Sequence, residues 1–138
     1  MPVGRRTKTR ARALQILYAW EMQGTPRMVD VASGLVRIVG KLPESLEEAE
    51  ELATAVAGQI EELDHEAGDA AENWRIDRLG VVDRNILRMA IYELRTETAP
   101  PKVIINEAVQ LAHWFGGLKS PGFVNGVLDR IAHSLGRL

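Results

Sequence analysis

The sequence has no cysteine in its 138 residues, which excludes disulfides, thiolate nucleophiles and zinc-thiolate sites. It also has no apolar run near the roughly 20 residues that a membrane-spanning helix needs. β-Strand signals are nearly absent, because the β-branched stretch at residues 103–105 lies inside a longer helical period. These absences predict one globular, all-α domain without cofactor or metal, and the lack of cysteine fits a reducing cytoplasm.

Apolar residues at spacings of three and four predict a bundle of about six to seven helices in two small subdomains, with a break between residues 40 and 80. Glycine and proline mark most of the ends, and Ser45 with Glu48 and Ser120 with Pro121 mark two starts. The third helical pattern carries Leu63, the fifth carries Phe115 and the sixth carries Leu135 on the buried stripe. We expect helices over residues 6–22, 28–39, from 45 toward 74, 82–97, 101–115 and from 120 onward.

Charge is unevenly spread along the chain. Residues 1–40 hold seven basic and two acidic side chains, whereas residues 41–72 hold one basic and eleven acidic ones. The acidic carboxylates are distributed through helical patterns without the loop spacing of a calcium site, so we expect a solvated helix face there. Because that block repels phosphate, nucleic acid should bind elsewhere.

Catalytic signals are lacking. The three histidines, His65, His113 and His133, are far apart and match no metal-binding spacing. The segment 116–120 differs from a phosphate-binding loop in its residue order and follows a helix, not a strand. The sequence therefore predicts a binding protein and no enzyme.

The first twelve residues are the strongest functional signal, because five of them are basic and no acid precedes Glu21. Such a cluster on the first turns of a helix usually faces a polyanion, most commonly nucleic acid. Helical geometry places Arg5, Lys8 and Arg12 outward, and places Arg6 and Arg10 in line with the apolar stripe but beyond the core. A frayed solubilising tail and an organelle-targeting presequence are the alternatives.

The sequence does not decide whether two aromatic residues, Phe123 and Tyr18, pack in the core or contact a ligand or partner. Phe123 lies at the edge of the last helix's apolar stripe, near Lys119, where it could stack on an unpaired base or pack on a neighbouring helix. Tyr18 lies on the flank of the first helix's stripe, a position that suits a half-buried ring. The helical pattern alone does not decide either role.

Several segments together resemble the bacterial NusB antitermination family. They are Arg5-Arg6 with Arg10, Ala13 and Leu17-Tyr18; residues 83–88 with 92–94; residues 105–109 with 111–112; and residues 123–129. The resemblance covers nearly the whole chain and is weakest over residues 25–50. It implies an all-helical NusB-like domain over residues 1–138 that binds single-stranded boxA RNA together with NusE, a small-subunit ribosomal protein. It further implies a role in RNA polymerase read-through, notably in ribosomal RNA operons, and leaves a homodimer open.

The resemblance and the charge pattern together give the expected site residues. RNA contacts are assigned to Arg5, Arg6, Lys8, Arg10, Arg12, Lys119 and Phe123. Contacts with the protein partner are assigned to Tyr18, Asp83, Arg84 and Asn125. Two alternatives remain: the NusB-like part of a ribosomal RNA cytosine methyltransferase, and a helical scaffold that binds only protein.

Overall fold

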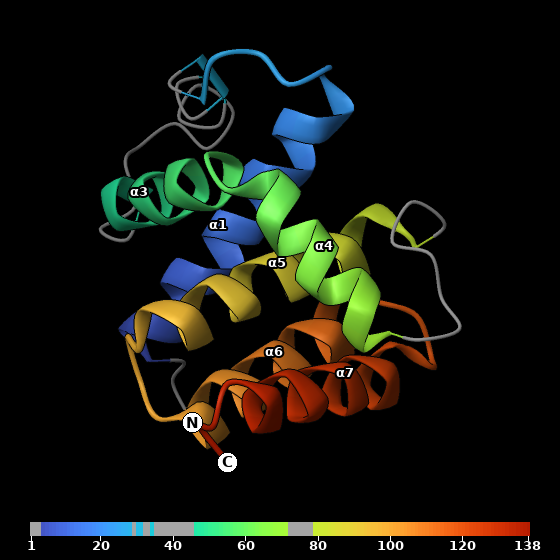
Figure 1. The fold of residues 1–138 in the computed structure, drawn as a ribbon. Helices are drawn as coiled ribbons and strands as arrows, with labels where there is room; N and C mark the ends of the chain where they lie inside the picture. The colour runs from blue at the N-terminus through green and yellow to red at the C-terminus, as the bar shows by residue number, and fades with distance from the viewer. Residues whose placement is uncertain (1–3, 29, 32–33, 35–45, 72–78) are drawn as a thin grey trace. The chain divides into compact units, whose positions relative to one another are not determined.

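The computed structural model describes residues 4–28, 30–31, 34, 46–71 and 79–138. Every regular element in these residues is a helix, so the all-α prediction is confirmed (Figure 1). The chain forms two compact units, residues 1–58 and residues 59–138. Each unit has its own packed helices.

The first unit is built around α1, Arg5–Met22, which matches the helix expected over residues 6–22. The helix ends where the backbone turns left-handed at Gly24, with φ 81°, and at Thr25, with φ 57°. Glycine adopts that conformation without a Cβ penalty, so Gly24 explains the predicted stop. Of the helix expected over 28–39, only residues 28, 30, 31 and 34 are described, and all four are helical.

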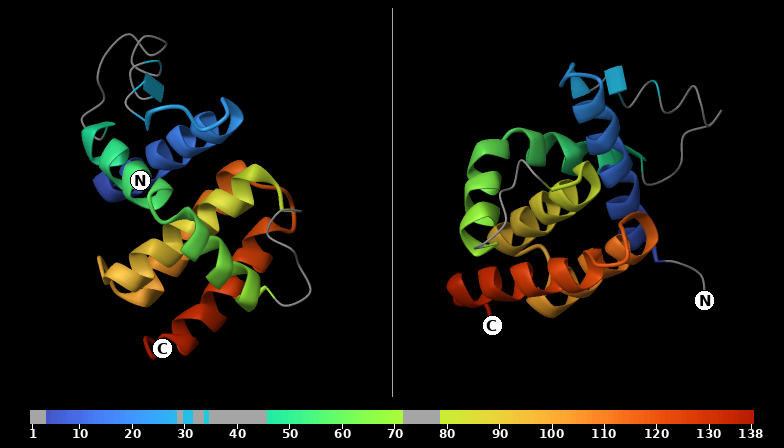
Figure 2. Two further views of the ribbon diagram at one scale, coloured as in Figure 1. Left: turned by 45° about the horizontal axis from the view of Figure 1, so that its top comes forward. Right: turned by 90° about the vertical axis from the view of Figure 1, so that its right-hand side faces the viewer.

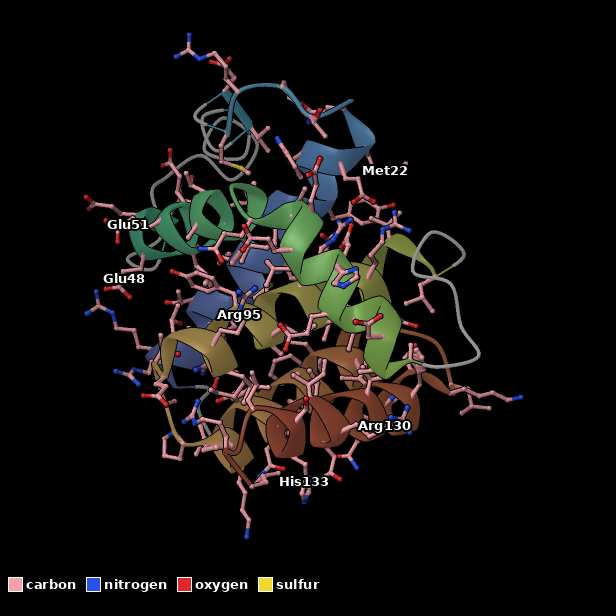
Figure 3. The ribbon with its side chains drawn as sticks, viewed as in Figure 1. Met22, Glu48, Glu51, Arg95, Arg130 and His133 are labelled. Carbon is pink, nitrogen blue, oxygen red and sulfur yellow. The ribbon has the colours of Figure 1, made fainter. Side chains whose placement is uncertain are left out.

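Helix α3, Leu46–Ala57, packs against α1. Its buried residues recur at spacings of three and four, which gives the helix one apolar face: Leu46, Ala49, Ala53 and Val56. The two alanines on that face are fully buried, and their small side chains allow the helices to approach closely. The glutamates of α3 lie outside this face, and Figure 3 labels Glu48 and Glu51 among them.

The third helical pattern of the sequence is two helices and not one. Helix α3 ends at Ala57, and a separate helix, α4, runs over Ile60–Ala70. Leu63 therefore belongs to α4. Gly58 stands in the break, where its low helix propensity favours a turn over a continuous helix. Ser45, the predicted capping residue, and Trp74, the predicted end of the pattern, lie outside the described residues.

The second unit contains α4, α5 (Val81–Thr96), α6 (Pro101–Phe115) and α7 (Ser120–Ser134). Helix α5 contacts all three others, and nine of its sixteen residues are buried. Helices α6 and α7 run alongside each other in both views of Figure 2. The expected helices at 82–97, 101–115 and from 120 onward are therefore confirmed to within one residue at their described starts and ends.

Two residues that the sequence pattern placed in the core are at the surface. Phe115 is 39% exposed and Leu135 is 38% exposed. Phe115 is the last residue of α6, and Leu135 follows the end of α7. A prediction of burial from helical periodicity assumes that neighbouring helices cover the apolar stripe along its full length. That assumption fails at these helix ends, where the side chains remain exposed.

An ion pair ties α4 to α5 within the second unit. The Arg88 guanidinium donates from Nε to Asp64 Oδ1 at 2.6 Å and from Nη2 to Asp64 Oδ2 at 2.7 Å. Its Nη1 donates to Asn85 Oδ1 at 3.0 Å, and Asn85 is itself fully buried. Because both carboxylate oxygens and all three guanidinium nitrogens are used, the pair fixes the position of α4 on α5.

Candidate nucleic-acid interface

The N-terminal turns of α1 carry the five basic residues found among the first twelve positions of the sequence. Arg5 forms an ion pair with Glu48 of α3, and both side chains are substantially exposed. Thr9 Oγ1 also lies 3.4 Å from Glu48 Oε2. Arg5 therefore has an internal partner, although an exposed pair of this kind is worth at most about 1 kcal/mol and can open.

Arg6 and Lys8 are exposed, and within the described part of the chain neither forms an ion pair or a side-chain hydrogen bond. The first turn of α1 contains no acidic residue and no side-chain cap. Cations at a helix N-terminus oppose the helix dipole, at a cost of about 0.3–1 kcal/mol each. This turn of α1 therefore presents positive charge that an external anion would stabilise.

Arg10 differs from the expectation that it lies beyond the core, because only 5% of it is exposed. It makes an internal interaction and is counted among the buried residues of α1. Arg12 is half-buried and donates from Nη1 to Gln15 Oε1 at 3.3 Å. Accessible positive charge on α1 is thus concentrated at Arg5, Arg6 and Lys8.

Tyr18 is 43% exposed, so its ring lies at the edge of the packed face of α1. Trp20, farther along the same helix, donates its indole N–H to the carbonyl oxygen of Pro26 at 2.9 Å. Trp20 is thereby used inside the first unit, while Tyr18 keeps surface for a partner.

In the second unit, the start of α7 holds Lys119, Phe123 and Asn125. Lys119 and Asn125 are exposed, and Phe123 is half-buried with an internal interaction. The intermediate burial of Phe123 agrees with a position at the edge of the α7 stripe. It leaves one part of the ring for packing and one part for a ligand.

Ser120 does not cap α7 as the sequence predicted. The residue before the helix is Lys119, and no side chain caps the first turn. The Ser120 hydroxyl instead accepts a hydrogen bond from the Gly117 N–H at 2.9 Å and donates to Asp83 Oδ2 at 3.0 Å. This buried serine therefore connects the α6–α7 loop to the first turn of α5.

Asp83 and Arg84, both assigned to the protein partner, make contacts inside the second unit. One oxygen of Asp83 accepts a hydrogen bond from the Ser120 hydroxyl, and the other, Oδ1, is buried and has no hydrogen-bond partner among the residues that the structure describes. Arg84 Nη1 donates to the carbonyl oxygen of Leu79 at 2.8 Å. Both side chains are half-buried, so they stabilise the start of α5 in addition to any role at a surface.

Sequence reasoning missed an aromatic surface at the end of α6. Trp114 is 45% exposed, and Leu118 in the following loop is fully exposed. Together with Phe115 they precede Lys119 within a few residues. The available signal was the position of Trp114 off the apolar stripe, in the last turn before the glycine pair that ends the helix.

A separate hollow of about 750 Å³ lies on the second unit, between α4, the end of α5 and α7. Figure 3 labels two of its lining residues, Arg95 and Arg130. The α4 side of the hollow is acidic, and Arg95 is already paired with Glu62 at 3.6 Å and Glu66 at 3.7 Å. Carboxylates repel phosphate, so this hollow is a poor nucleic-acid site.

Among the described residues, no group of three or more histidine, aspartate or glutamate side chains is arranged to hold a metal ion. None of the helices in the described ranges combines the length and apolar character of a membrane span. What these residues do offer chemically is charge, aromatic surface and hydrogen-bonding groups.

A family profile, related sequences and solved structures all match this chain, and they indicate the same family. The NusB family profile matches residues 7–133. The transcription antitermination protein NusB of Sorangium cellulosum is 41% identical over 99% of this chain and 97% of its own length. The structure of NusB from T. maritima superimposes with a TM-score of 0.82 at 30% identity, covering 96% of this chain and 93% of that one.

A second solved structure contains the antitermination factors NusB and NusE in complex with double-stranded RNA. It matches with a TM-score of 0.81 at 30% identity, over 94% of this chain and 97% of the matched chain. The family resemblance inferred from the sequence segments is confirmed, and so is the prediction of a non-catalytic protein, because the relatives are transcription antitermination factors. The chain belongs to the NusB family of transcription antitermination proteins.

Proposed function

We propose that this protein binds boxA-type single-stranded RNA together with NusE and thereby promotes read-through by RNA polymerase, notably in ribosomal RNA operons. The observation that carries the RNA part is the exposed pair Arg6 and Lys8 on a helix turn that lacks any acid. A phosphate backbone offsets the unfavourable placement of these cations at a helix N-terminus. The solved NusB–NusE complex with double-stranded RNA supports the choice of partners, and the preference for a single strand is part of the proposal.

The two units supply separate RNA contacts in this proposal. In the first unit Arg5, Arg6 and Lys8 bind phosphates, and Arg12 lies next to them on the same helix. In the second unit Lys119 binds a phosphate and the exposed part of the Phe123 ring meets a base. Phosphates carry no sequence information, so recognition of boxA depends on base contacts such as that of Phe123.

The assignment to the protein partner is strongest for Tyr18 and Asn125, because both are exposed. Asp83 and Arg84 remain proposed partner residues that also stabilise the start of α5 through their internal hydrogen bonds. Assembly with RNA polymerase and action in the cytoplasm complete the proposal, and it requires no homodimer.

We expect the double variant Arg6→Ala, Lys8→Ala to bind RNA more weakly and with a smaller salt dependence. Each lost phosphate contact with a single strand lowers the slope of log K against log salt by about 0.7, so the slope should fall by about 1.4. The measurement is an RNA titration between 50 and 200 mM salt.

The matched control removes two exposed positive charges elsewhere, Arg27→Ala with Lys102→Ala. If this control lowers the slope as much as the α1 variant does, the effect is general charge loss and α1 is not the RNA site. Arg10 is left unchanged, because replacing a buried arginine would mix a folding defect with a binding defect.

The decisive test of the function is a titration of boxA RNA and of a scrambled strand, each with and without NusE. We expect boxA to bind more tightly than the scrambled strand and NusE to enlarge that difference. Equal affinities for both strands under all conditions would contradict sequence-specific recognition. NusE binding without any RNA binding would favour the protein-only scaffold instead.

A further inference from the structure

The end of α6 and the loop that follows it expose three large apolar side chains close together in the sequence. Trp114 is 45% exposed, Phe115 is 39% exposed and Leu118 is fully exposed. The two rings meet edge to face with centroids 6.4 Å apart. Adjacent exposed aromatic rings on a globular protein usually mark an interaction surface, because burying them would otherwise stabilise the fold.

This loop is held in place by hydrogen bonds. The Gly116 N–H donates to the carbonyl oxygen of Ala112 at 2.9 Å, and the Ser120 N–H donates to that of Gly117 at 3.1 Å. The Ser120 hydroxyl accepts from the Gly117 N–H and donates to Asp83. The backbone on both sides of the loop is therefore fixed, so the ligand would meet rings on a preorganised support and lose less entropy on binding.

The charge around these rings favours nucleic acid over a protein surface. The sequence contains no aspartate or glutamate from residue 108 to residue 128. Lys119 is exposed directly after Leu118, and the carboxylate of Asp83, which reaches this loop from α5, accepts a hydrogen bond from the Ser120 hydroxyl. Exposed rings beside a cation, without acids, suit a single strand whose bases stack and whose phosphates are negative.

We propose that Trp114 is a base-stacking residue: an unpaired base of the bound strand stacks on the indole, Phe115 supports the indole from its edge, and Lys119 binds a neighbouring phosphate. This inference rests on the proposed RNA-binding function and adds to it a contact on α6, outside the α1 and α7 residues already assigned. Stacking tolerates any base, so Trp114 adds affinity and register more than base identity.

The test compares Trp114→Ala with Val103→Ala in titrations of single-stranded boxA RNA with the full chain. Val103 is also on α6 and is 43% exposed, so it controls for the loss of exposed apolar surface. We expect Trp114→Ala to weaken RNA binding about 5- to 150-fold, the usual range for losing one stacked base, and Val103→Ala to bind as the wild type does. Trp114→Phe should restore part of the affinity, because a ring remains.

Two further readouts separate stacking from other causes. Trp114→Ala should leave the salt slope unchanged, whereas Lys119→Ala should lower it by about 0.7. In a series of RNAs with one abasic position each, one position should weaken the wild type but not Trp114→Ala, because base and ring act as a pair. Thermal unfolding of each variant shows whether the fold is intact.

The outcomes distinguish this inference from the proposed function. Salt-dependent RNA binding by the wild type, with Trp114→Ala equal to Val103→Ala, would overturn the stacking role alone. Loss of NusE binding in Trp114→Ala with unchanged RNA binding would show that the surface contacts protein, which also overturns it. Absence of salt-dependent RNA binding in the wild type itself would overturn both.

Discussion

Replacing Arg88 by methionine is expected to lower the free energy of unfolding by about 3–4 kcal/mol, because one partner of a desolvated ion pair is removed. The Arg88 side chain is 7% exposed and that of Asp64 is 26% exposed. Without the guanidinium, Asp64 keeps its charge in a poorly solvated position and Asn85 loses a donor. Methionine fills much of the vacated volume, so the cost reports electrostatics more than a cavity.

Denaturant-induced unfolding measures this change, with Arg95→Met as the control. Arg95 is on the same helix and also pairs with carboxylates of α4, but its side chain is 34% exposed and its contacts are 3.6–3.7 Å long. Exposed pairs of this kind contribute at most about 1 kcal/mol. Equal losses in the two variants would show that burial does not set the strength of the Arg88 pair.

A double variant identifies the source of the loss. Adding Asp64→Asn to Arg88→Met removes the uncompensated charge while keeping the shape of the side chain, so part of the lost stability should return. If the double variant is less stable than Arg88→Met by the full additive amount, the orphaned carboxylate is not the cause.

The variant Gly116→Ala is expected to destabilise the protein by about 3 kcal/mol, the upper end of the usual cost of overpacking. A Cβ on Gly116 would lie 2.7 Å from both Cβ and Oγ of Ser120 and 2.8 Å from the carbonyl oxygen of Ala112. Ser120 cannot move away easily, because its hydroxyl is bonded to Gly117 and Asp83. The added methyl group must therefore open the α6–α7 junction.

Gly117→Ala is the matched control, because a Cβ there would meet only Ser120 Oγ, at an ordinary 3.9 Å. Its stability should change by less than about 0.5 kcal/mol, as for most surface substitutions. The measurement is again equilibrium unfolding. A similar loss in both variants would mean that loop flexibility, and not the close approach at Gly116, decides the stability of the junction.

The family and the helix ends could be read from the sequence because they depend on local signals. Gly24 ends α1, Pro101 opens α6 and the glycine pair at 116–117 ends it, all as expected from short-range backbone preferences. The four sequence segments that resemble NusB lie in chain order and needed no coordinates. The basic character of the α1 N-terminus was equally visible.

The candidate site was only partly predictable, and the residues that differ show why. Arg10 belongs to the same basic cluster at the start of α1 as Arg6 and Lys8. It is nevertheless buried, whereas Arg6 and Lys8 are exposed. Phe115 fits the α6 stripe by periodicity, yet it is exposed where the helix ends. Periodicity gives the direction of a side chain around its own helix, and it does not report whether another segment covers that position.

The sequence by itself determined the fold class, the ends of α1, α5 and α6 to within one residue, and the non-catalytic family. These properties follow from composition and from interactions between residues close in the chain. The tertiary structure decided the Arg88–Asp64 pair, the Ser120–Asp83 link, the break at Gly58 and the exposed rings beside Lys119. Contacts between residues distant in sequence set burial and pairing, and such contacts exist only once the chain has packed.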